Sequence, residues 1–101
     1  MTLRHVVTWT FAEPDPAARM RQLLEFKALL DALPPVIPEI LALEVGINEL
    51  YPDANWHITL VSEFADQAAL ERYQVHPAHK AVIEHNRGRT SGRAAVDFTV
   101  A

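Results

Sequence analysis

Residues 3–11 alternate between two faces, which is the period of a β-strand. The odd positions carry Leu3, His5, Val7, Trp9 and Phe11, and the even ones carry Arg4, Val6, Thr8 and Thr10. Residues 40–49, 56–64 and 93–100 alternate in the same way and are rich in β-branched or aromatic side chains. The pattern therefore predicts four strands. Residues 50–55, which contain Pro52-Asp53, are turn-type, so we expect the second and third strands to form a hairpin.

After the first strand the hydrophobic residues recur at steps of three and four, as in an amphipathic helix. Asp15 suits the N-cap and Pro16 the first helical position, while Pro34-Pro35 ends the segment because proline cannot continue a helix. The predicted apolar stripe consists of Met20, Leu23, Phe26, Leu30 and Leu33, with Leu24 and Leu29 beside it. The stripe predicts a helix that packs on an apolar layer.

A second helical pattern follows the third strand. It begins at Asp66 and is interrupted at His76-Pro77, because the residue before a proline is disfavoured in helical conformation. A further helix is predicted from Pro77 to about Arg87, followed by a flexible loop over residues 88–92. One side of this last helix carries His79, Val82, Ile83 and Asn86.

The resulting order β-α-β-β-α(α)-β predicts an α+β fold of ferredoxin-like type, with a four-stranded antiparallel sheet and its helices on one face. The other face would still show apolar sets such as Val6-Thr8-Thr10. Exposed apolar sheet of this extent usually marks an interaction surface. We therefore expect a homodimer in which two sheets pack face to face, with a covered monomer core as the alternative.

The composition of the chain restricts the class of protein further. The chain has 101 residues, half of them hydrophobic, which predicts a single domain over residues 1–101. Its net charge of −4 argues against nucleic-acid binding, and no apolar run is long enough to span a membrane. The absence of cysteine excludes disulfides and thiol chemistry. The N-terminus lacks the pattern of a signal peptide, so we expect a soluble, cytoplasmic protein.

The chain contains five histidines, His5, His57, His76, His79 and His85. The densest motif is Tyr73-Gln74-Val75-His76-Pro77-Ala78-His79. Other distinctive segments are Leu3-Arg4-His5-Val6-Val7, Ile37-Pro38 before Leu43-Glu44-Val45-Gly46, and Arg93-Ala94-Ala95-Val96-Asp97-Phe98. Together these segments make residues 3–100 resemble the stress-responsive A/B barrel (Dabb) family.

The resemblance implies a dimeric α+β barrel, in agreement with the sheet-face argument, and most members of the family have no assigned reaction. One plant branch, the polyketide cyclases of olivetolic acid type, performs an intramolecular aldol condensation with a histidine and a tyrosine. The matching positions are His79 as the base and Tyr73 as its partner. By the same resemblance His5 and His57 are candidate substrate-binding residues, and we add Trp9, which stands on the His5 face of its strand.

This chemistry suits the residue types. An imidazole with an ordinary pKa near ~6.5 can remove a proton from a carbon beside a carbonyl at neutral pH. A tyrosine hydroxyl can donate a hydrogen bond to the enolate oxygen that forms. No metal or organic cofactor is required, so the hypothesis is cofactor-free acid/base chemistry on a small carbonyl or aromatic ligand.

The alternative is a non-catalytic, stress-related dimer whose histidines are structural. In that case His5 and His57 would be hydrogen-bonded strand residues, His76 would cap the helix that follows it, and His85 would lie on the surface. A metal site is not favoured, because Pro77 breaks the helical spacing between His76 and His79. Haem-degrading monooxygenase chemistry has no distinctive motif here. An open cavity lined by Tyr73 and His79 would favour the enzyme, and one filled by Trp9, Phe26 and Ile83 would favour the scaffold.

Overall fold

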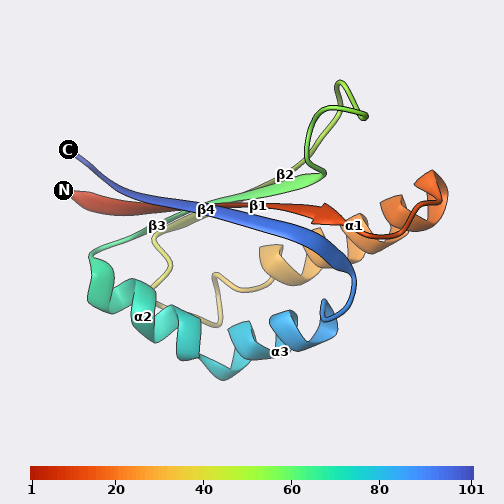
Figure 1. Ribbon diagram of the computed structural model, residues 1–101. Coiled ribbons are helices and arrows are strands. Elements are labelled where there is room, and N and C mark those ends of the chain that lie inside the picture. Colours follow the sequence, from red (N-terminus) through yellow and green to blue (C-terminus); the bar gives the residue numbers. More distant parts are fainter.

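A computed structural model describes residues 1–101 and contains four strands and three helices (Figure 1). In chain order they are β1 (Thr2–Phe11), α1 (Pro16–Asp31), β2 (Ala42–Ile47), β3 (Ile58–Phe64), α2 (Gln67–Val75), α3 (Pro77–His85) and β4 (Thr90–Val100). The strands form one antiparallel sheet in the order β2-β3-β1-β4. The predicted ferredoxin-like α+β fold is therefore confirmed. No helix is both long and apolar enough to span a bilayer.

The helices begin where the sequence predicts. The Asp15 carboxylate accepts a hydrogen bond from the Ala18 N–H at 2.8 Å, and Asp66 caps α2 through the Ala69 N–H at 2.9 Å. Each cap satisfies an amide of the first turn that has no partner within the helix. At the end of α3, Gly88 adopts a positive φ of 79° and turns the chain into β4.

The two faces of the sheet differ sharply. The helices cover one face, where the core contains Leu23, Phe26 and Leu30 of α1 together with side chains of the inner strands (Figure 1). The strand register places Val6 opposite Val61 on β3 and Val96 on β4, so all three lie on the other, uncovered face. Edge strand β4 is largely exposed, and the main helix–strand packing joins α1 with β2 and α2 with β3.

Several predicted boundaries were wrong. The strand predicted over residues 40–49 spans only Ala42–Ile47, and the one predicted from Trp56 begins at Ile58. Backbone pairing does continue beyond these limits, since the Asn48 N–H donates to the His57 carbonyl at 2.8 Å. The loop predicted over residues 88–92 is shorter, because β4 begins at Thr90. In the predicted stripe of α1, Met20 and Leu24 are exposed, whereas the other members are buried or partly buried.

Candidate active site

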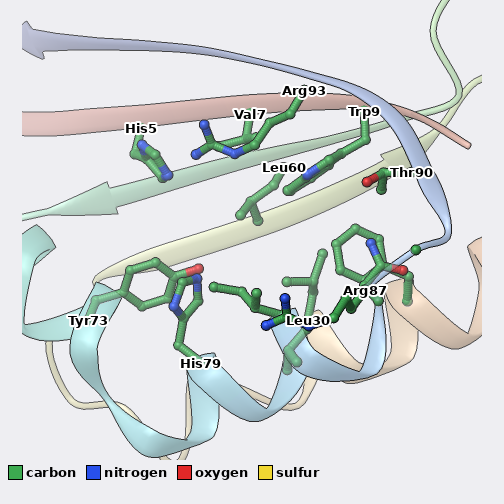
Figure 2. A pocket seen from close by; sticks show the side chains of 15 residues that line it. His5, Val7, Trp9, Leu30, Leu60, Tyr73, His79, Arg87, Thr90 and Arg93 are labelled. Atoms are coloured by element: carbon green, nitrogen blue, oxygen red, sulfur yellow. The ribbon is translucent and has the colours of Figure 1, made fainter.

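A cavity of about 370 Å³ lies between the sheet and helices α1, α2 and α3 (Figure 2). Its apolar lining consists of Val7, Trp9, Phe26, Leu30, Leu60, Val82 and Ile83. Trp9 and Phe26 pack edge to face with ring centroids 4.9 Å apart. They form part of the cavity lining without filling it, and Ile83 is half exposed. The volume falls within the range of about 300–1,000 Å³ that is usual for small-molecule sites.

Tyr73 and His79 reach this cavity from the two helices on either side of the break at His76-Pro77. Their ring centroids are 4.3 Å apart, and Figure 2 shows the Tyr73 hydroxyl beside the imidazole of His79. Tyr73 is 1% exposed, and its burial raises its pKa to about 12. The phenol therefore remains protonated and available as a hydrogen-bond donor at neutral pH.

The imidazole of His79 is held in one tautomer. Its Nδ1 lies 3.0 Å from the carbonyl oxygen of Gln74, which can only accept a hydrogen bond, so Nδ1 carries the proton. The Nε2 lone pair is left free. Burial lowers the pKa of His79, against the opposing effect of the Gln74 hydrogen bond. The side chain is thus a neutral base at pH 7.

His5 lines the same cavity from β1 and is almost fully buried. Its Nδ1 contacts the carboxylate of Asp97, which lies opposite it on β4. Because a carboxylate accepts the hydrogen bond, Nδ1 of His5 carries a proton, and Nε2 is the ring nitrogen left without a partner. Its ring centroid is 6.5 Å from that of Tyr73. The cavity therefore combines two imidazoles and one phenol.

The other histidines lie elsewhere. His57 does not line the cavity, although the resemblance suggested a substrate-binding role: its Nδ1 accepts a hydrogen bond from the Phe11 N–H at 2.8 Å, where the pairing of β1 with β3 ends. Burial also lowers the pKa of His57. The predicted cap is confirmed at His76, whose Nδ1 accepts from the Ala78 N–H at 3.0 Å. His85 is exposed, as expected.

The sequence reasoning gave three polar side chains no role at this site. Arg93 and Asn86 line the cavity, and Asp97 supports His5 from outside it. The strand pattern had put Asp97 on the face opposite Val96 and Phe98, but pairing it with His5 requires the register between the first and last strands. Asn86 was seen beside His79 on one helical side. Its buried Oδ1 has no hydrogen-bond partner, a property that depends on tertiary contacts and not on the local sequence pattern.

Similar structures share this architecture. A dimeric protein of unknown function from Bacteroides fragilis is 30% identical, covers 98% of this chain and 96% of its own, and superimposes with a TM-score of 0.90. A Dabb family protein from Mesorhizobium loti is 26% identical over 99% of this chain and 97% of its own, with a TM-score of 0.73. A hydroxynitrile lyase from Passiflora edulis, 14% identical over 99% and 94%, shares the fold with a TM-score of 0.76.

No curated protein matches the chain significantly. The family profile of the stress responsive A/B barrel domain matches residues 3–100, which is nearly the whole chain. The chain belongs to the stress responsive A/B barrel domain (Dabb) family.

Proposed function

We propose that the cavity binds a small carbonyl compound and that His79 and Tyr73 transfer a proton at the carbon beside the carbonyl group without a cofactor. The observation that carries the proposal is the pairing of a neutral, tautomer-fixed imidazole with a buried phenol at one apolar cavity. A base and a hydrogen-bond donor on the same side of a ligand are what enolisation needs.

The step balances without a co-reactant. Nε2 of His79 takes the proton from carbon, and the electron pair of the broken C–H bond forms the C=C bond of an enolate. The negative charge moves to the former carbonyl oxygen, to which the Tyr73 hydroxyl donates a hydrogen bond. In a cyclase-like reaction the enolate carbon then attacks a second carbonyl of the same molecule, and the alkoxide takes the proton back from His79.

His5 has a positioning role in this proposal. The Asp97 carboxylate orients its ring, so its Nε2 can form a hydrogen bond with a ligand oxygen. Trp9 would pack against the flat part of the ligand, because its ring lines the apolar wall. His57 has no part in binding, because its ring is engaged with the β1 backbone outside the cavity.

The test is hydrogen–deuterium exchange at the methyl group of acetophenone in D₂O, followed by ¹H NMR. We expect the protein to accelerate exchange, and we expect His79→Gln to lower the rate by about 10²-fold or more, as is typical for loss of a general base. Tyr73→Phe should lower the rate by about tenfold or more through loss of one hydrogen bond to the developing charge. Each variant is checked for native folding by circular dichroism.

His85→Gln is the matched control. His85 lies on the same helix as His79 but is exposed and does not line the cavity. Its substitution should leave the exchange rate unchanged. If the wild-type protein does not accelerate exchange, or if folded His79→Gln retains the full rate, acid/base catalysis is refuted and the non-catalytic alternative gains support.

We also propose that the chain forms a homodimer through the uncovered face of its sheet. The Bacteroides fragilis protein is described as dimeric. In this chain Val96 and Phe98 of β4 lie on that face and are 62% and 41% exposed. Apolar side chains on an open sheet favour contact with a second copy.

A further inference from the structure

The charge of the cavity is opposite to that of the protein. The chain carries thirteen acidic and nine basic residues, for a net charge of −4. Among the residues that line the cavity, however, Arg87 and Arg93 are the charged ones, and there is no aspartate or glutamate. The nearby carboxylate of Asp97 is engaged with His5. A concave, mostly apolar site with only positive side chains attracts anions, because the low-dielectric walls strengthen the field inside it.

The two arginines are not equivalent. Arg87 is neutralised by Glu84, with Nη2 2.7 Å from Oε2, and this pair is largely exposed. Four of the arginines form ion pairs with carboxylates, Arg4, Arg72, Arg87 and Arg89, and Arg93 is not among them. Arg93 is thus the guanidinium at the cavity whose charge no side chain balances.

The position of Arg93 follows from the strand register. It lies opposite Trp9 on β4, so its side chain leaves the sheet on the helix side. Figure 2 shows it running along β4 from Trp9 towards His5, over Val7. The positive charge of Arg93 also acts to lower the pKa of both Tyr73 and His79, as expected for a guanidinium facing the same space. An anion held by Arg93 would therefore lie near the proposed acid/base pair.

We infer that the ligand of this cavity is an organic carboxylate, a keto acid with an aromatic or similarly flat apolar body, and that Arg93 binds its carboxylate group. The inference deepens the proposed function and rests on it for the keto group. A guanidinium can donate two parallel hydrogen bonds to a carboxylate, which fixes orientation as well as affinity. The apolar body would lie between Trp9 and the side chains of α3, with its carbonyl towards Tyr73.

The experiment compares two probes of the same shape, 4-acetylbenzoate and its neutral isostere 4-acetylbenzamide, by isothermal titration calorimetry. The wild-type protein should bind the carboxylate at least about tenfold more tightly, since hydrogen bonds to charged groups contribute more than a neutral pair does. Arg93→Met should abolish this preference, with a larger loss of affinity for the carboxylate than for the amide. Arg93→Lys should retain part of the preference for the carboxylate, because a lysine keeps the positive charge but cannot form the bidentate pair of hydrogen bonds.

Arg21→Met is the control for a general change in charge. Arg21 is an exposed arginine of α1 that does not line the cavity and has no carboxylate partner, so its loss should leave both affinities unchanged. Equal binding of the two probes, binding of neither, or a preference that survives Arg93→Met would overturn the inference.

The two proposals fail separately. If acetophenone exchange is accelerated but the carboxylate is not preferred, the carboxylate assignment is wrong and the acid/base function stands. If 4-acetylbenzoate is preferred through Arg93 but no exchange is accelerated, the cavity is an organic-acid binding site without catalysis.

Discussion

The two histidines that face the cavity are oriented by different acceptors. A backbone carbonyl accepts from Nδ1 of His79 and a carboxylate accepts from Nδ1 of His5, so Nε2 is the nitrogen without a protein partner in both rings. The two rings differ in their place at the cavity: His79 lies beside Tyr73, at a ring-centroid distance of 4.3 Å, whereas the His5 ring is 6.5 Å from Tyr73. The proposal therefore gives the role of base to His79 and the holding of a ligand group to His5.

This environment predicts the pH profile of the exchange reaction. Burial lowers the pKa of His79, so the rate should fall only when the pH drops below that lowered value, which lies under the ordinary 6.5. On the alkaline side the rate should hold until Tyr73 ionises near its raised pKa of about 12, as far as the fold survives. The check is the exchange rate against pH, with the His79 ring proton titrated by NMR. An acidic limb centred at or above 6.5 would contradict the assignment.

The same shift links pH to stability. When the folded pKa of a histidine is lowered, the unfolded chain binds more protons between the folded and unfolded pKa values, so stability increases with pH across that window. We expect the thermal midpoint to fall as the pH drops below about 6.5, the ordinary histidine value. His79→Gln should reduce this slope, and the remainder should come from His57, whose pKa is also lowered. An unchanged slope in His79→Gln would show that His79 titrates normally in the folded protein.

At the scale of the elements, the break between α2 and α3 brings Tyr73 and His79 together. Tyr73 lies in α2 and His79 in the first turn of α3, with His76 in an extended conformation between them. An uninterrupted helix would place residues six apart about 120° from each other around the axis and about 9 Å apart along it, since each residue turns the helix by about 100° and adds about 1.5 Å. The break at His76-Pro77 instead lets α3 start in a new direction, and the rings of His79 and Tyr73 lie side by side with a tilt of 45°.

The role of His76 as a cap gives a separate prediction. His76→Ala removes the acceptor for the Ala78 N–H and should lower the free energy of unfolding by about 1 kcal/mol, measured by urea denaturation. His76→Ser should restore most of this loss, because a serine oxygen can cap the helix equally well. If His76→Ala instead leaves stability unchanged but abolishes exchange, His76 has a chemical role and not a capping one.

The sequence predicted the elements better than the site. Alternation and helical spacing identified all four strands, all three helices and the capping residues Asp15 and His76, because these features depend on local pattern. The ends of the strands were predicted less accurately, because backbone hydrogen bonds continue beyond the residues assigned to each strand. The side of α3 that carries His79 and Asn86 was also recognised, and both residues line the cavity.

What the sequence could not give were relations between distant strands. Whether His57 faces the cavity depends on how β3 ends against β1, and both sides of β3 are partly apolar. The contact of His5 with Asp97 spans 92 positions and follows from the β1–β4 register alone. Arg93 likewise meets the cavity only because the same register places it opposite Trp9.

For the molecule as a whole, the asymmetry of the sheet supports the proposed homodimer. One face is covered by helices, whereas the other carries Val6, Val61, Val96 and Phe98 with no helix over them (Figure 1). The β2–β3 loop rises on the side of the sheet opposite α2 and α3, and its Leu50 and Tyr51 are exposed (Figure 1). A second sheet laid on this face would bury these apolar residues and could contact the loop as well.

We therefore expect light scattering coupled to size-exclusion chromatography to give twice the mass of one chain. Val96→Glu should shift the protein towards the monomer, because burial of an unpaired carboxylate in an apolar interface is unfavourable. Leu24→Glu is the matched control: Leu24 is an exposed apolar residue on α1, on the helical side, and its substitution should leave the dimer intact. A dimer that survives Val96→Glu but dissociates with Leu24→Glu would place the interface on the helices.

Because the cavity lies on the helical side of the sheet, a folded monomeric Val96→Glu variant should still bind 4-acetylbenzoate, which separates assembly from ligand binding.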